Sequence, residues 1–303
     1  MFDLHFHSLA SDGKASLADL AAACVARPQL RRLALADHDH VASSVAFAVL
    51  EPRALVAIEL TAALGQGAAH LLAVGLRPDD PALVAYLELR RLERQERLSA
   101  WAQLLRAQGL RFELDPVLAD NTSFGKPHIV EELRRHSENA ALLPAVSVDP
   151  AASDPIYTSH LKVGGLADIS KLVPNRLIEL PEAIALVHAA GGLSFLAHPL
   201  TSLYLAGQKR EGADWRIGVP KAERTIAALA EAGLDGLEVF AHGQEEPEFI
   251  GVLLSLAQRH NLLVSAGSDD HTVDGAYIGT ALAADDPRAA GYLAAIEERL
   301  GTA

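Results

Sequence analysis

The stretch "DLHFHSLASDGK" (3–14) decides how the rest of the chain is interpreted. Side chains alternate along a β-strand, so Asp3, His5 and His7 share one face of an extended segment. A face that carries Asp-x-His-x-His suits neither a hydrophobic core nor an ordinary solvent-facing surface. We therefore ask which ligand these three side chains bind.

The composition limits the classes of function. The 303 residues suit one large domain or two smaller ones, and 50% of them are hydrophobic, which allows a sizeable core. With 39 acidic and 26 basic residues the net charge is -13, which argues against a duplex-DNA binder with a basic stripe. A small phosphorylated ligand stays compatible with this charge, because a metal ion or a local basic pocket reverses the local field.

The chain shows no targeting or membrane signal. The first residues lack a basic region followed by an apolar one, and no stretch of about 18 uncharged apolar residues occurs. Cys24 is the one cysteine, so no intrachain disulfide is expected, and its apolar surroundings predict a small buried side chain. We therefore expect a cytoplasmic protein without a membrane partner.

Both ends of the chain alternate strand-like and helix-like segments, which predicts parallel βα units and an α/β barrel. Strands are expected at 2–8, 32–37, 55–62, 70–76, 193–199, 236–242 and 262–271. Between them, residues 82–108 form one long helical pattern, and 126–136 form a second helix with Pro127 in its first turn. Residues 1–80 and 179–303 are thus predicted to form the barrel, and 81–178 a helical insertion.

Imidazole and carboxylate side chains recur where the predicted strands end. In a βα barrel these ends open into one mouth, where active sites lie. The residues at these positions are His5, His7, Asp37, His38, Glu59, His198, His242, Asp269 and His271. A single histidine at a strand end is more often a hydrogen-bonded structural residue, but the recurrence over many strands favours one shared site. His70 does not fit this pattern, because it begins its predicted strand.

The chemistry of these donors points to metal ions. Imidazole and carboxylate together suit zinc, manganese or iron. A pair at i and i+2 presents both donors to one ion, and a carboxylate such as Glu59 can bridge two ions. Such clusters hold ions about 3.5–4 Å apart and clamp the oxygens of a transferring phosphoryl group.

Six short motifs resemble those of the polymerase and histidinol phosphatase (PHP) family. They occur in the family's order within roughly 1–80 and 181–275: "DLHFHSLASDG", "ALADHD", "AIELT", "HLLAVGL", "FLAHP" and "GSDDH". The chain looks most like stand-alone bacterial members, which act on nucleoside 3′,5′-bisphosphates or on the 5′ ends of short RNA. These members also carry a helical insertion with an element similar to Gly125-Lys126-Pro127-His128.

The resemblance implies a distorted (β/α)7 TIM-like barrel with two to three divalent ions, Mn, Zn or Fe. It assigns the ligands residue by residue: His5, His7, Glu59 and Asp269 to a first ion, Glu59, His70 and His198 to a second, and Asp12, His38 and His271 to a third. All nine positions are filled, which argues against a non-catalytic binding module.

The resulting prediction is a metal-dependent phosphoesterase in which a hydroxide bridging two ions attacks phosphorus in line. His242 or Asp37 would protonate the leaving oxygen. The structural alternatives are a hydrogen bond for His242 and, for Asp37, the orientation of a ligand histidine. The functional alternatives are a phosphatase of another small phosphorylated metabolite, and an amide or lactone hydrolase with the same metal centre.

Basic residues in the insertion favour phosphate over a carbonyl substrate. Arg94, Arg97, Lys126 and His128 are predicted to grip a second phosphate, with the insertion lying over the barrel mouth and the helix start favouring an anion. Alternatively, the arginines pair with glutamates on a solvated helix face, Lys126 is a solvated helix-start residue, and His128 packs locally.

Overall fold

A computed structural model describes residues 1–65, 67–115, 117, 123–146, 154–173, 176–203, 215–283 and 285–302. The chain divides into two compact units. The barrel unit contains Met1–Leu9, Gly13–Tyr86 and Leu177–Ala303. The helical unit contains Ala10–Asp12 and Leu87–Arg176.

The strands of the barrel unit form two parts that join at both edges. They are β1 (Phe2–Phe6), β2 (Arg32–Leu35), β3 (Ala57–Leu64), β4 (Gly67–Val74), β5 (Leu193–Leu196), β6 (Gly236–Ala241) and β7 (Leu263–Gly267). β1 pairs with β2, and β3 to β7 form one sheet in chain order. Isolated parallel bridges join Phe6 to Asp270 and His38 to Glu59. The sheet therefore curls toward closure, as expected for a distorted α/β barrel.

The expectation of uniformly parallel strands is wrong at β4. This strand runs antiparallel to both β3 and β5. β3 ends at Leu64 and β4 begins at Gly67, and so short a connection can only reverse the chain. Gly65 supplies the positive φ of +62° that a tight turn requires. The reversal places the beginning of β4 at the edge where β3 ends.

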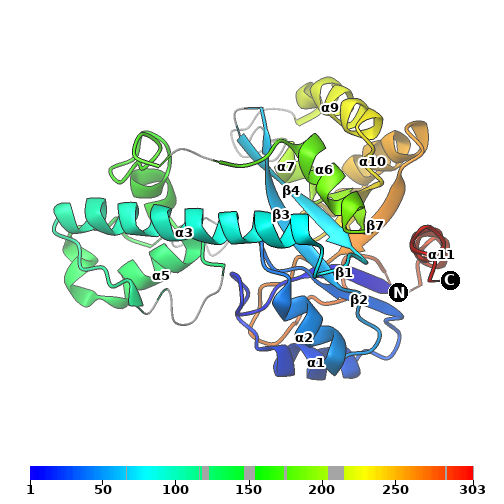
Figure 1. Ribbon diagram of the computed structural model, residues 1–303, viewed down its shortest axis with the longest axis horizontal. Helices are drawn as coiled ribbons and strands as arrows, with labels where there is room; N and C mark the ends of the chain where they lie inside the picture. The colour runs from blue at the N-terminus through cyan, green and yellow to red at the C-terminus, as the bar shows by residue number, and fades with distance from the viewer. Residues whose placement is uncertain are drawn as a thin grey trace. The chain divides into compact units, whose positions relative to one another are not determined.

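Helices cover the outer side of the strands (Figure 1). They are α1 (Leu17–Val25), α2 (Ala42–Leu50), α6 (Leu180–Ala189), α7 (Pro199–Ser202), α9 (Val219–Glu231), α10 (Pro247–Arg259) and α11 (Ala289–Leu300), with a 3₁₀ turn at Trp215–Gly218. α1 begins with a capping box, in which the Asp19 N–H donates to Ser16 Oγ and the Ser16 N–H donates to the Asp19 carboxylate.

Apolar side chains pack between the first strands and their helices. Phe6 of β1 meets Phe47 of α2 edge to face, with ring centroids 5.5 Å apart. Cys24 is fully buried in the same cluster, as its sequence context predicts. This core holds β1 in place through its apolar side chains, so the polar side chains at the end of the strand are available for binding.

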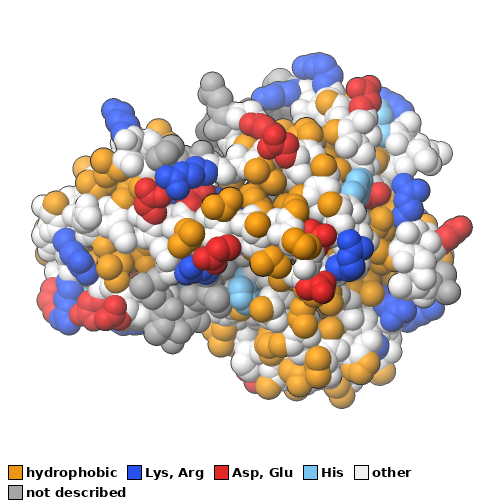
Figure 2. Space-filling view, viewed as in Figure 1, with side chains coloured by type: hydrophobic (Ala, Val, Ile, Leu, Met, Phe, Trp, Pro, Cys, Tyr) orange, Lys and Arg blue, Asp and Glu red, His pale blue; other side chains and the backbone are white. Residues whose placement is uncertain are grey.

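The helical unit has a hydrophobic core of its own. Its elements are α3 (Pro81–Ala107), whose first turns belong to the barrel unit, α5 (Lys126–Arg135), a 3₁₀ turn at Ser137–Ala141 and a π turn at Tyr157–Leu161. Trp101, Phe112, Phe124 and Ile129 are among its buried side chains. The exposed side of α3 mixes apolar and charged side chains (Figure 2). No helix in the described ranges is long and apolar enough to cross a membrane.

Candidate metal centre

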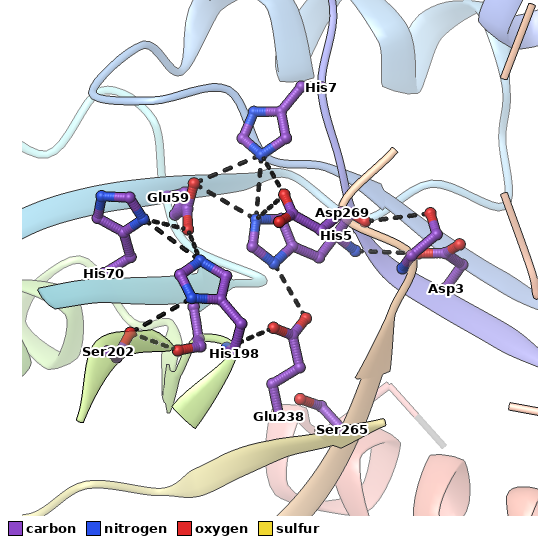
Figure 3. A network of polar contacts seen from close by, with 12 residues as sticks. Asp3, His5, His7, Glu59, His70, His198, Ser202, Glu238, Ser265 and Asp269 are labelled. Atoms are coloured by element: carbon purple, nitrogen blue, oxygen red, sulfur yellow. Dashed lines mark hydrogen bonds and ion pairs between the residues drawn. The ribbon is translucent and has the colours of Figure 1, made fainter. Parts of the chain in front are cut away.

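The two histidines of the opening stretch lie at the heart of a buried cluster (Figure 3). His5 and His7 are both fully buried, and their Nε2 atoms lie 3.1 Å apart. Asp269, just beyond the end of β7, brings its Oδ1 to 3.1 Å from His7 Nε2 and 3.7 Å from His5 Nε2. The first and last motifs of the chain therefore meet, because β1 and β7 end side by side.

Glu59 connects this cluster to a second one. Its Oε2 lies 3.4 Å from Nε2 of His5 and 3.4 Å from Nε2 of His7. Its Oε1 lies 3.0 Å from His70 Nδ1 and 2.9 Å from His198 Nε2. The carboxylate thus turns one oxygen to each group of imidazoles, which is the arrangement of a bridging ligand.

The position of His70 follows from the reversal of β4. In the antiparallel register His70 faces Thr61, two residues beyond Glu59 on β3. The expectation that His70 begins its strand and that Glu59 lies near the end of its strand is wrong, because His70 is the fourth residue of β4 and Glu59 the third of β3. The antiparallel pairing nevertheless brings the two residues close together. His70 Nδ1 also lies 3.3 Å from His198 Nε2, which completes the second group.

A third group surrounds the outer side of His7. The rings of His7 and His271 stack with centroids 4.2 Å apart, and the ring of His38 lies 4.7 Å from that of His7. His271 Nδ1 donates to the backbone carbonyl of Asp269 at 2.7 Å, so Nε2 keeps its lone pair. Asp12 belongs to the helical unit, and its assignment to this group stays a prediction.

These donors fit divalent cations. Several lone-pair atoms of buried imidazoles and carboxylates point at one another within hydrogen-bond distance, an arrangement that a cation between them would relieve. Mixed nitrogen and oxygen ligands of this kind suit Zn, Mn or Fe. Within the described residues, the sets that can offer converging ligand atoms include His5, His7 and Asp269, and also His38, Glu59 and His70.

The surrounding charges favour the ionised form of both carboxylates. Burial alone would raise the pKa of Glu59, but the imidazoles of His38, His70 and His5 outweigh it and hold that pKa well below its usual range. Burial likewise opposes ionisation of Asp269, and its hydrogen bond with His7 together with the charge of His5 lowers its pKa. Burial is also the main cause that lowers the pKa of His7 and of His70, which favours their neutral, ligand form.

Two of the candidate ligands have strained backbones. His198 has φ 28° and Asp269 has φ 51°, in the region that non-glycine residues rarely adopt. Such strain persists where surrounding contacts impose it, and it concentrates at functional sites. Here the strained backbone directs the side chains of His198 and Asp269 into the cluster.

Three buried carboxylates lie behind the candidate ligands. Asp37 accepts hydrogen bonds from Ser8 Oγ and Ser43 Oγ, both at 2.6 Å, and its Oδ1 lies 4.0 Å from His7 Nδ1. Asp3 accepts from the backbone N–H groups of His5, Ser268 and Gly279. Burial raises the pKa of Asp3 to about 6.

Glu238, which the sequence analysis did not single out, contacts both His5 and His198.

His242 lies in a more open setting. Its side chain is 51% exposed, its Nδ1 lies 3.1 Å from Glu245 Oε1, and its ring stacks on Tyr277 with centroids 4.6 Å apart. His242 therefore has the solvent contact that Asp37 lacks, since Asp37 is fully buried.

The candidate phosphate-binding residues all belong to the helical unit. Arg94 donates to the carbonyl of Phe124, and the Arg97 guanidinium lies 5.2 Å from the centre of the Trp101 ring. The pKa of Lys126 is lowered by burial and by the charge of Arg97, so the two cations lie near each other. His128 uses both ring nitrogens inside the unit, since Nδ1 accepts from the Gly125 N–H and Nε2 donates to the Ser11 carbonyl.

Known proteins of similar sequence are enzymes that act on phosphate esters. No family model matches the chain. The 3′,5′-nucleoside bisphosphate phosphatase of Chromobacterium violaceum is 27% identical over 277 residues, which covers 89% of this chain and 86% of that protein. The 5′-3′ exoribonuclease Rnm of Escherichia coli is 24% identical over 279 residues, which covers 89% and 85%.

Solved structures agree with this relationship. A proposed metal-dependent phosphoesterase of Bifidobacterium adolescentis superimposes with a TM-score of 0.72 at 26% identity, over 98% of this chain and 96% of that one. A Chromobacterium violaceum protein called an amidohydrolase, solved with sulfate and no metal, gives a TM-score of 0.69 at 26% identity, over 92% and 89%. The resemblance inferred from the six motifs is therefore confirmed: the chain is similar in sequence to the bisphosphate phosphatase and the exoribonuclease, and in fold to a metal-dependent phosphoesterase.

Proposed function

We propose that this protein is a metal-dependent phosphoesterase that hydrolyses a phosphate ester of a nucleotide, such as a nucleoside 3′,5′-bisphosphate, or of a short oligonucleotide. The observation that carries the proposal is the pair of Glu59 oxygens, each turned to a different group of imidazoles. Bound ions supply Lewis acidity toward a phosphoryl oxygen and lower the pKa of bound water. The protein would hold the ligand side chains in place and keep their ion-facing atoms deprotonated.

We expect about two to three metal ions per chain, because the candidate ligand groups share His7 and His38, and Glu59 turns its two oxygens to different imidazoles. Elemental analysis of protein purified without a chelator measures this number directly. Less than one ion per chain, after incubation with Mn²⁺, Zn²⁺ or Fe²⁺ and removal of the excess, would overturn the metal centre.

The geometry favours different roles for the two candidate proton donors. Both carboxylate oxygens of Asp37 accept from serine side chains or backbone, and Oδ1 lies at the far nitrogen of His7. In this setting Asp37 supports a ligand histidine, as in the structural alternative. His242 is an exposed imidazole, a common proton donor in catalysis, so we assign the protonation of the leaving group to His242.

A second phosphate site in the helical unit accounts for the cations gathered there. Burial and the neighbouring charges of Arg90 and Arg94 lower the pKa of Arg97, and Lys126 lies within the influence of the same group. Cations held together against mutual repulsion suit a polyanion, and α5 begins beside them at a glycine that has no side chain to cap it. His128 supports the Ser11 carbonyl in this arrangement. That the insertion covers the barrel mouth remains part of the proposal.

Lys126→Ala is expected to raise the KM for a nucleoside 3′,5′-bisphosphate about tenfold to hundredfold, since a charge-assisted hydrogen bond contributes about 1.5–3 kcal/mol. The KM for an aryl phosphate should barely change, because its single phosphoryl group is the one being cleaved. Steady-state kinetics with both substrates measure the difference. Lys162→Ala, which removes an exposed lysine of the same unit, is the matched control. An unchanged KM for the bisphosphate, or an equal rise for both substrates, contradicts the second phosphate site.

The second candidate function is an amide or lactone hydrolase, which one structural relative's name brings forward. The same ions polarise carbonyl groups. The cation group around Arg97 and Lys126 favours phosphate. A substrate panel of bisphosphates, 5′-phosphorylated short RNAs, amides and lactones separates the two candidates, and turnover of only the last two classes would overturn the phosphoesterase.

A further inference from the structure

One buried carboxylate that the proposed reaction does not use touches ligands from both ion groups. Glu238 lies on β6 and is fully buried. Its Oε1 lies 2.9 Å from His5 Nδ1, and its Oε2 accepts the backbone N–H of His198 at 2.7 Å. Figure 3 shows Glu238 on the far side of both imidazoles from the converging ligand atoms. It is therefore placed behind the centre, where it can orient ligands without binding an ion.

The neighbouring strand makes room for this contact. A Cβ added at Gly267 of β7 would lie 2.2 Å from His5 Cβ and 2.4 Å from Glu238 Oε1. Contacts this short are not tolerated, so any residue larger than glycine would push His5 and Glu238 apart. The lack of a side chain at Gly267 therefore allows the Glu238 carboxylate to reach His5 Nδ1.

Both partners of Glu238 act as donors. The His198 N–H can only donate, and His5 Nδ1 donates its proton to the carboxylate. The lone pair of His5 is then on Nε2, the atom that lies 3.1 Å from His7 Nε2 and 3.4 Å from Glu59 Oε2. The other hydrogen bond ties down the backbone of His198, whose φ of 28° needs an outside contact to persist.

We propose that Glu238 is the positioning residue of the metal centre: it sets the tautomer and direction of His5, and it holds His198 in its strained backbone conformation. Through these two hydrogen bonds one side chain supports a ligand on each side of the Glu59 carboxylate. The proposal rests on the metal centre and is independent of the identity of the substrate.

Glu238→Gln separates the two roles. The amide must turn its oxygen to the His198 N–H, which leaves its NH₂ group facing His5 Nδ1. His5 then has to accept at Nδ1, which puts its proton on Nε2, the atom needed by an ion. We expect metal affinity to fall about tenfold to hundredfold at the His5 group, with the His198 group retained. Glu238→Ala removes both hydrogen bonds and should weaken both groups.

Asp235→Asn is the matched control. Asp235 directly precedes β6 and is also a buried carboxylate that accepts from a histidine and a backbone N–H: His188 Nε2 at 2.7 Å and the Ser194 N–H at 2.9 Å. Neither partner is a candidate ligand. The measurements are ions per chain by elemental analysis, metal affinity by chelator competition, and thermal unfolding of each metal-free protein. No substrate is required, so the outcome is independent of the proposed reaction.

The expected pattern is a partial loss of bound metal in Glu238→Gln, a larger loss in Glu238→Ala, and wild-type metal binding in Asp235→Asn. Wild-type stoichiometry and affinity in Glu238→Gln would overturn the proposal. So would equal losses of metal in Glu238→Gln and Asp235→Asn, because the effect would then follow general destabilisation. If Glu238→Ala does not fold, Glu238→Gln and Asp235→Asn still decide the question.

Discussion

Replacing Glu59 by alanine should reduce hydrolysis by at least about a thousandfold, which is the largest effect we expect from a single substitution. The reason is that each carboxylate oxygen faces a different group of imidazoles, so one deletion removes a ligand from two ions. The deletion also leaves His38, His70 and His5 without the buried negative charge that faces them.

Asp12→Ala is the comparison, because Asp12 is assigned to one ion only. We expect it to lower the rate about tenfold to hundredfold when metal occupancy is matched. Glu59→Gln, which keeps the volume of the side chain, tests whether the loss comes from charge and ligation or from a cavity. Rates measured at saturating metal, beside elemental analysis, give the answer. Equal residual rates in Glu59→Ala and Asp12→Ala would argue against a bridging carboxylate.

Removing the metal should abolish hydrolysis, and restoring a divalent ion should recover it. We expect the chain to stay folded after chelation and dialysis, because Phe6, Phe47 and their neighbours form a hydrophobic core that contains none of the candidate ligands. Imidazole ligands bind metal only after losing a proton, so metal should be lost more readily as the pH falls. Activity assays and circular dichroism after chelation test both parts. Full activity in protein shown by elemental analysis to be metal-free would contradict the proposed function.

The sequence alone determined the elements and most of the candidate ligands. Alternation along 3–14 showed that His5 and His7 share a face, and the apolar rhythm located the strand that carries Glu59 and the strands that precede His198 and Asp269. The helices 82–108 and 126–136 were also visible, because periodicity over that length is a local property. These features depend on residues close together in the chain.

Tertiary structure alone decided the rest, because it depends on which distant segments become neighbours. The antiparallel direction of β4 explains how His70, the fourth residue of that strand, comes to lie beside Glu59, and a short turn at Gly65 sets that direction. Glu238 carries no motif signal, and its role appears only when β6 lies beside β7 and Gly267 leaves room for its contact with His5. For the same reason His128 and Asp37, which sequence reasoning considered for direct roles, show their hydrogen bonds to Ser11 and to Ser8 only in the folded chain. Local periodicity specifies which face a side chain occupies, whereas long-range packing specifies which groups that face meets.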